Sequence, residues 1–163
     1  MGVGNLLMGD DGVGPAAIEA LRRAGLDTRA ELIDAGLAFP EVLCDLAPSR
    51  PLVIVDAVRP DGRPGSLFRL TPEDLAAESG GMAPAVSLHE VSILPALRME
   101  ALAGRARADV TIFGIECRDV AWGEGLSAPV AAALEKLVGA IRRYLDERAA
   151  APARPAACGS ENA

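Results

Sequence analysis

Acidic residues and a single histidine are the side chains of this chain best suited to chemistry. Two adjacent carboxylates, Asp10 and Asp11, lie in a glycine-rich stretch at the start of the chain, and Asp56 ends an apolar run. The only histidine is His89. Carboxylate oxygens and a neutral imidazole suit a divalent first-row metal and leave coordination positions for water or substrate. If the fold brings these residues together, the sequence predicts a metal site.

Each of these residues also has a purely structural interpretation. Asp56 could cap a turn after a strand, and either Asp10 or Asp11 could cap the helix that follows them. His89 could be a packing residue in the first turn of a helix, where the helix dipole favours the neutral imidazole that binds metals. The metal hypothesis therefore depends on the three positions taken together.

The glycine-rich stretch predicts a backbone that turns sharply or passes close to another group. It begins like a dinucleotide-binding fingerprint, but Leu7 stands where the third glycine would be. No lysine follows Gly9 as a phosphate-binding loop requires, and the two carboxylates would repel phosphate. A Ser/His/Asp hydrolase would need a G-x-S-x-G elbow, which the sequence does not contain. Nucleotide binding and serine hydrolysis are therefore the weaker hypotheses.

Composition narrows the class of protein. The 163 residues suffice for one domain with its own core, and a 50% hydrophobic but only 3% aromatic composition predicts an aliphatic core. A net charge of −7 argues against binding nucleic acid or an anionic membrane. The sequence shows neither a membrane-spanning run nor a signal peptide. Three scattered cysteines, Cys44, Cys117 and Cys158, suit a reducing compartment, so we expect a cytoplasmic protein.

Helical and extended patterns alternate along the chain. Residues 51–58 and 109–115 are predominantly apolar, as expected of strands buried on both faces of a parallel sheet. The further predicted strands are 30–34 and, at an edge, 66–71; the predicted helices are 12–24, 39–46, 72–78, 87–102 with a kink at Pro95, and 127–148. We expect one domain over residues 1–148 and a disordered tail over 149–163.

This alternation predicts an α/β three-layer sandwich with a twisted, mostly parallel sheet flanked by helices. Ligands of such sheets bind beyond the carboxyl ends of the strands. That rule selects the loop with Asp10 and Asp11, the strand end at Asp56, and the strand end at Asp34.

Three sequence segments resemble the hydrogenase maturation endopeptidases, the processing proteases of nickel–iron hydrogenases. The order and spacing of the segments agree with that family, and the resemblance covers roughly residues 2–145. The segments are Gly-Val-Gly-Asn-Leu-Leu-Met-Gly-Asp-Asp-Gly-Val-Gly-Pro at 2–15, Leu-Val-Ile-Val-Asp-Ala at 52–57 and Ser-Leu-His at 87–89.

The resemblance implies a function and a set of site residues. Asp11, Asp56 and His89 would be the metal ligands and the catalytic residues. The enzyme would remove a C-terminal peptide from the hydrogenase large-subunit precursor after nickel insertion, and act as a monomer. The metal would be the nickel of the precursor or another divalent ion, polarising the scissile carbonyl or a water. A non-catalytic, chaperone-like module that binds a metalloenzyme precursor is the alternative.

The sequence departs from the family pattern at two places. Leu37 stands where the turn Asp34-Ala-Gly-Leu37 would carry a hydroxyl in the family, so substrate contacts there are expected to differ. Only Met1 precedes the glycine-rich stretch, whereas the first strand of a doubly wound sheet is central. We therefore expect the first central strand to be missing from this sequence, and about five to eight Val-, Ile- or Leu-rich residues to be encoded upstream.

Overall fold

The computed structural model describes residues 1–58, 62–79 and 90–150, which form one five-stranded sheet with helices on both sides. The strands are β1 (Gly2–Val3), β2 (Asp34–Gly36), β3 (Leu52–Val58), β4 (Leu67–Leu70) and β5 (Val110–Glu116). The helices are α1 (Val13–Arg23), α2 (Phe39–Asp45), α3 (Pro72–Ser79), α4 (Glu90–Leu102) and α5 (Ala128–Ala150), with 3-10 turns η1 (Gly9–Gly12) and η2 (Leu26–Thr28).

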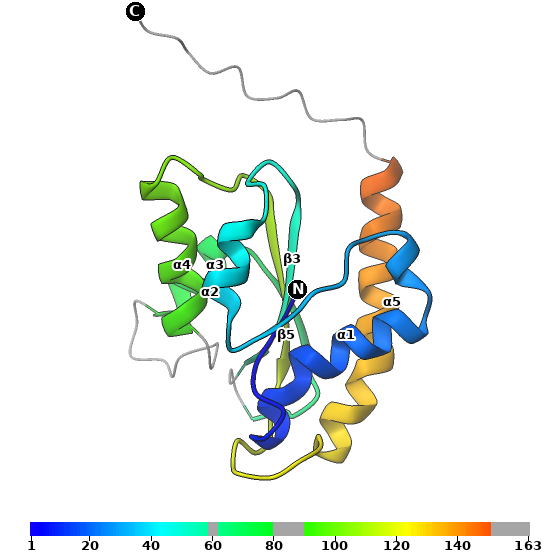
Figure 1. The fold of residues 1–163 in the computed structure, drawn as a ribbon. Helices are drawn as coiled ribbons and strands as arrows, with labels where there is room; N and C mark the ends of the chain where they lie inside the picture. The colour runs from blue at the N-terminus through cyan, green and yellow to red at the C-terminus, as the bar shows by residue number, and fades with distance from the viewer. Residues whose placement is uncertain (59–61, 80–89, 151–163) are drawn as a thin grey trace, which may run out of the picture.

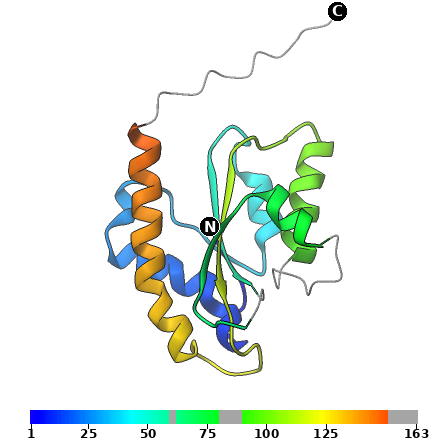
Figure 2. The same cartoon turned by 180° about the vertical axis from the view of Figure 1, so that it is seen from behind.

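The strand order is β2-β1-β3-β5-β4, and only β4, at one edge, runs antiparallel to its neighbour. Figures 1 and 2 show α1 and α5 on one face of the sheet and α2, α3 and α4 on the other. Each face has its own apolar core, one including Val55 and Phe113 and the other including Ile54 and Ile112. The three-layer α/β sandwich expected from the sequence is therefore confirmed.

The centre of the sheet corrects one expectation. A central strand is present, because Gly2–Val3 pair in parallel with both β2 and β3 as β1. It is only 2 residues long. Gly2 was predicted to lie in a loop but belongs to this strand. Because Gly2 has no side chain, α1 can lie close against the strand: a Cβ at Gly2 would stand 2.3 Å from the carbonyl oxygen of Gly14.

Other elements follow the predicted pattern with one displacement. The strand expected at residues 30–34 lies later, at Asp34–Gly36, because its pairing with β1 sets its position. Asp34 is therefore at the start of β2 and exposed, not at a carboxyl end, and its Oδ1 accepts a hydrogen bond from the Gly36 N–H at 3.1 Å. The predicted tail from residue 151 onward lies outside the described residues, whereas residues 149 and 150 belong to α5.

The carboxyl ends of the parallel strands lie at one edge of the sheet. The loops after β1, β2 and β5 leave the sheet at its carboxyl end, at the bottom of Figure 1. Among the helices of the described residues, none is long and apolar enough to cross a membrane.

Candidate functional site

Asp11 is held in η1, the short turn between β1 and α1. Its carboxylate is only 5% exposed, and its Oδ2 accepts a hydrogen bond from the Asn5 N–H at 2.8 Å. Gly4 lies tightly beneath this turn with φ +132°, and a Cβ there would stand 1.9 Å from the Asp11 carbonyl oxygen. Only glycine fits that approach, so the glycine-rich pattern serves to bury the Asp11 carboxylate at the end of β1.

Asp10 has a structural role across the same edge. Its carboxylate, 1% exposed, accepts hydrogen bonds from the backbone N–H groups of Arg118, Asp119 and Ser127 at 2.8, 3.1 and 2.6 Å. The Ser127 hydroxyl adds a bond at 2.9 Å, and α5 begins one residue later. Asp10 therefore fastens the β5–α5 loop and the start of α5, whereas the N-cap of α1 is Gly12.

These hydrogen bonds also determine the charge state of Asp10. Burial alone would raise the pKa of the Asp10 carboxyl, but the bonds from Ser127, Arg118 and Asp119 outweigh it and hold the pKa below its ordinary 3.8. The interpretation of Asp10 or Asp11 as a helix cap is thus wrong for α1. Nothing near Asp10 in the sequence could have indicated this role, because its partners lie 108 to 117 residues away.

Asp56 lies two residues before the carboxyl end of β3 and is fully buried, with 0% exposure. Its neighbours Ile54 and Val58 belong to the core beneath α2 and α4, so strand alternation places the Asp56 side chain on that face. Across from it on β5 is Gly114, which has no side chain. The turn η1 that carries Asp11 contacts β3. The fold therefore brings the Asp11 and Asp56 segments to one edge of the sheet.

His89 lies outside the described residues. The next residue, Glu90, begins α4, which packs through Ile93 and Leu94 into the same core as Ile54 and Val58. Across residues 1–58, 62–79 and 90–150, no three His, Cys, Asp or Glu side chains lie close enough together to hold a metal ion. The segments that carry Asp11 and Asp56 lie at this edge, and carboxylates are suitable ligands of a divalent metal.

Glu116 is a buried carboxylate at the carboxyl end of β5 that the sequence did not single out. It is 1% exposed, and its Oε1 accepts a hydrogen bond from the Arg63 N–H. The Glu116 backbone also pairs with Ser66 and Gly65. These contacts hold the chain that enters β4 against the end of β5, so we assign Glu116 to the framework of this edge.

Exposed apolar side chains surround the same edge of the sheet. We call them the apolar rim: Leu6, Leu7, Leu37 and Trp122, which are 55%, 47%, 66% and 81% exposed. Their loops are joined by backbone hydrogen bonds, Gly4 N–H to the Gly36 carbonyl at 3.1 Å and Gly123 N–H to the Leu7 carbonyl at 3.0 Å. Large side chains in this setting are typical of a surface that binds another protein.

Comparison with known proteins agrees with this architecture. The family model for the HycI hydrogenase maturation protease matches residues 15–144. The Hydrogenase 2 maturation protease of Escherichia coli is 30% identical over 148 residues, which cover 87% of this chain and 88% of that protein. A putative hydrogenase maturation protease of Methanocaldococcus jannaschii is 29% identical over 146 residues, covering 86% of this chain and 91% of that protein.

Solved structures give the same relationship. The [NiFe] hydrogenase maturation protease HybD from Thermococcus kodakarensis superposes with a TM-score of 0.73 at 26% identity, covering 88% of this chain and 95% of that one. The hydrogenase maturating endopeptidase HybD from E. coli superposes with a TM-score of 0.72 at 25% identity, covering 90% of each chain. The sequence and the fold thus agree, and the chain belongs to the hydrogenase maturation protease family.

Proposed function

We propose that this protein is an endopeptidase that removes the C-terminal peptide of a nickel–iron hydrogenase large-subunit precursor after nickel insertion. One observation on this member of the family carries the proposal. Its fold places two buried carboxylates, Asp11 and Asp56, at the carboxyl edge of the sheet. The nickel ion of the precursor is then part of the substrate. The reaction takes place in the cytoplasm, where the precursor is assembled.

Asp11, Asp56 and His89 are the residues that engage the metal. Carboxylate and imidazole ligands leave open positions on a divalent ion, so the ion can remain attached to the precursor while it is held. A metal at this site supplies Lewis-acid polarisation for peptide hydrolysis. The hydrogen bond from the Asn5 N–H orients one oxygen of the Asp11 carboxylate. The Asp56 carboxylate is fully buried, and its burial excludes water around it.

The apolar rim gives the precursor a surface to bind. A folded precursor must present an extended segment to the carboxylates, and the rim lies on the loops that frame them. Leu37 is part of this rim, so the residue that departs from the family pattern provides an apolar contact in place of a hydroxyl.

The test is a processing assay with purified nickel-loaded precursor, three site variants and one control variant. We expect Asp11→Asn and Asp56→Asn to lower the cleavage rate at least about 100-fold, because one ligand is lost from the site. Asp27→Asn, at an exposed carboxylate in η2, is the matched control and should cleave at the wild-type rate. His89→Ala should behave like the two site variants.

The mass of the precursor separates this proposal from its alternative. An endopeptidase shortens the precursor, whereas a chaperone-like module forms a complex and leaves its mass unaltered. Unchanged precursor mass with the wild-type protein, or full cleavage by both Asp11→Asn and Asp56→Asn, would overturn the proposal.

A further inference from the structure

Asn5 stands next to Asp11 at the carboxyl edge of the sheet, and its side chain has a defined orientation. The backbone N–H of Asn5 donates to Asp11 Oδ2 at 2.8 Å. Its side-chain Oδ1 accepts a hydrogen bond from the Leu7 N–H at 3.0 Å, which closes an Asx turn. Because a backbone N–H can only donate, the side-chain atom that it meets must be the amide oxygen. The bond from Leu7 therefore fixes which way the Asn5 amide is turned.

The NH₂ group of the same amide is left free to bind. An asparagine amide carries two N–H donors on Nδ2. Within residues 1–58, 62–79 and 90–150, the hydrogen bonds of Asn5 use its backbone and its Oδ1, and none uses Nδ2. The residue is half-buried, so its side chain keeps contact with solvent. Two oriented donors without an acceptor suit a carbonyl oxygen of an arriving molecule.

The strand register places Asn5 further out along the edge than Asp56. Gly2 pairs in parallel with Val55, so Val3 lies level with Asp56 on the neighbouring strand. Asn5 follows two residues later, on the chain that leaves the carboxyl end of β1. It therefore lies beside one proposed metal ligand and beyond the other, on the side from which a substrate approaches.

Asn5 also connects the proposed metal ligands with the apolar rim. Leu6 and Leu7, the next two residues of the chain, are 55% and 47% exposed members of the rim. Asn5 is bonded to Leu7 on one side and to Asp11 on the other. A precursor segment that runs from the rim to Asp11 therefore passes the Asn5 amide.

We propose that Asn5 is a further catalytic residue, whose Nδ2 donates a hydrogen bond to the carbonyl oxygen of the peptide bond that is cleaved. In the hydrolysis, the oxygen of a water molecule bonds to the carbonyl carbon, the C–N bond breaks, and a proton of that water goes to the leaving nitrogen. The carbonyl oxygen is negatively charged until the C–N bond breaks. An N–H oriented beforehand by the Asx turn stabilises this charge without first having to reorient. The inference rests on the proposed peptidase function and adds a donor to it.

Substitutions at position 5 separate the donor from the turn. Asn5→Asp and Asn5→Ser keep an oxygen that can accept the Leu7 N–H, but neither has an amide N–H, and Asn5→Ala has neither group. We expect all three to lower kcat for nickel-loaded precursor at least about 100-fold, with KM changed less than about threefold. The melting temperatures of the aspartate and serine variants should stay within about 2 °C of the wild type.

Two further comparisons exclude other causes of a lower kcat. Asn5→Ser adds no charge beside Asp11, so a loss that it shares with Asn5→Asp is not due to charge. Thr28→Ala removes a different local side-chain bond, from the Thr28 hydroxyl to the Gly25 carbonyl at 3.0 Å, at an exposed position in η2. This control variant should cleave with the wild-type kcat.

The restored activity of a single variant pair would decide against the donor. If Asn5→Ala is slow but Asn5→Asp and Asn5→Ser cleave normally, the turn matters and the proposal is wrong. It is also wrong if all three variants keep the wild-type kcat, or if they raise KM alone. Each of these results leaves the peptidase function standing, provided that the wild-type protein shortens the precursor and Asp11→Asn does not. A wild-type protein that leaves the precursor intact overturns the proposed function and this inference with it.

Discussion

At the scale of single residues, the neighbouring carboxylates of Asp10 and Asp11 have different roles. Asp10 is surrounded by donors from the β5–α5 loop, which stabilise its charged form and fix the loop. Asp11 lies in η1, which contacts β3, and its Oδ2 accepts a hydrogen bond from the Asn5 N–H. Adjacent identical side chains thus divide into one that builds the edge of the sheet and one that serves the proposed reaction.

This division predicts opposite outcomes for the same substitution. Asp10→Asn replaces an acceptor oxygen by an NH₂ group that faces N–H donors, so it should lower the free energy of unfolding by about 2–4 kcal/mol. Asp11→Asn should change that free energy by less than about 1 kcal/mol while abolishing cleavage. Urea unfolding and the processing assay measure the two effects. Equal loss of stability in both variants would contradict the division.

The Met1 amino group gives a prediction about pH. Burial lowers its pKa from 8.0 to about 6 in the folded chain. Between pH 8 and pH 6 the unfolded chain therefore binds a proton that the folded chain does not, so the free energy of unfolding falls as the pH falls, by about 2–3 kcal/mol. Urea titrations at pH 6 and pH 8 measure this slope.

The control for that slope is the same chain with Gly-Ser-Gly-Ser-Gly fused directly before Met1. Its Met1 nitrogen is a peptide amide, and its new terminal amino group stands on a Gly/Ser segment, where folding should leave the pKa unchanged. The difference between the two slopes therefore belongs to the Met1 amino group. An identical pH dependence of the two chains would show that this group is not buried as a base.

At the scale of elements, the close packing of α1 on β1 positions the site. A Cβ at Gly14, in the first turn of α1, would stand 2.1 Å from the Val3 carbonyl oxygen. No side chain fits there without moving α1 away from the sheet. Since η1 leads directly into α1, such a movement would also displace Asp11.

Gly14→Ala should accordingly lower the free energy of unfolding by about 3 kcal/mol or more. The matched control is Gly139→Ala in α5, where the nearest atom to an added Cβ is the flexible Arg143 Nη1 at 3.6 Å. That variant should be neutral or more stable by up to about 1 kcal/mol, because alanine is the better helix former. Thermal unfolding of the two variants measures the difference in stability. Similar melting temperatures would contradict the close packing of α1 on β1.

Local sequence patterns predicted most elements because they act within each segment. The apolar runs of β3 and β5 and the amphipathic α1 and α5 were predicted close to their observed bounds. The displacement of β2 to Asp34–Gly36 could not be predicted, since pairing with β1 determines it. The structural roles of Asp10 and Glu116 could not be predicted for the same reason, because their hydrogen-bond partners come from distant loops. The strand-end rule selected the loop with Asp10 and Asp11 and the strand end at Asp56, whose segments the fold brings to one edge, but it also selected Asp34, which starts β2. The choice of Asp11 over Asp10 came from the family resemblance.

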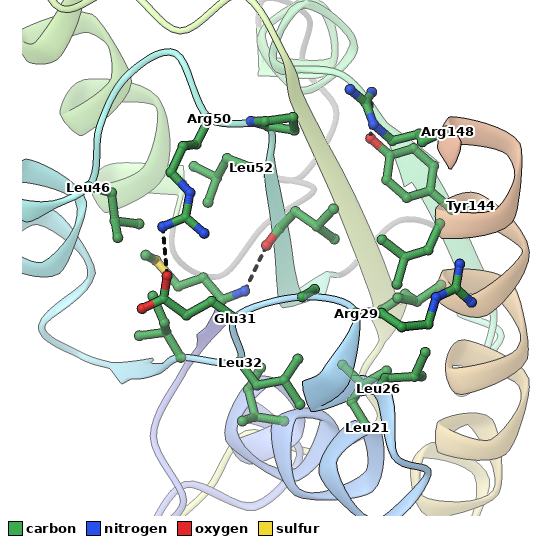
Figure 3. Close-up of a pocket in the computed structure, with 18 of the residues that line it drawn as sticks. Leu21, Leu26, Arg29, Glu31, Leu32, Leu46, Arg50, Leu52, Tyr144 and Arg148 are labelled. Carbon is green, nitrogen blue, oxygen red and sulfur yellow. Dashed lines mark hydrogen bonds and ion pairs between the residues drawn. The ribbon is translucent and has the colours of Figure 1, made fainter. Parts of the chain in front are cut away.

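At the scale of the whole molecule, the two edges of the sheet have separate properties. The carboxyl edge holds the buried carboxylates and the apolar rim, and a cavity of about 280 Å³ lined by Met1 lies at the amino edge (Figure 3). Exposed apolar residues also occur far from the rim: Leu102, 87% exposed, ends α4 near the amino edge, at the top of Figure 1. The molecule therefore provides its own control for a test of whether the rim binds the precursor.

Trp122→Ser and Leu37→Ser should weaken binding of the precursor and leave the chemical step intact. Each removes a large exposed side chain from the rim, and apolar anchors of this kind contribute about 1–2 kcal/mol to an interface. We expect the KM for the precursor to rise about tenfold with kcat almost unchanged, since both side chains are exposed whereas the proposed carboxylate ligands are buried. Leu102→Ser removes a side chain that is just as exposed and should leave both parameters at the wild-type values. If all three variants raise KM alike, exposed apolar area in general and not the rim is responsible; if none does, the precursor binds elsewhere.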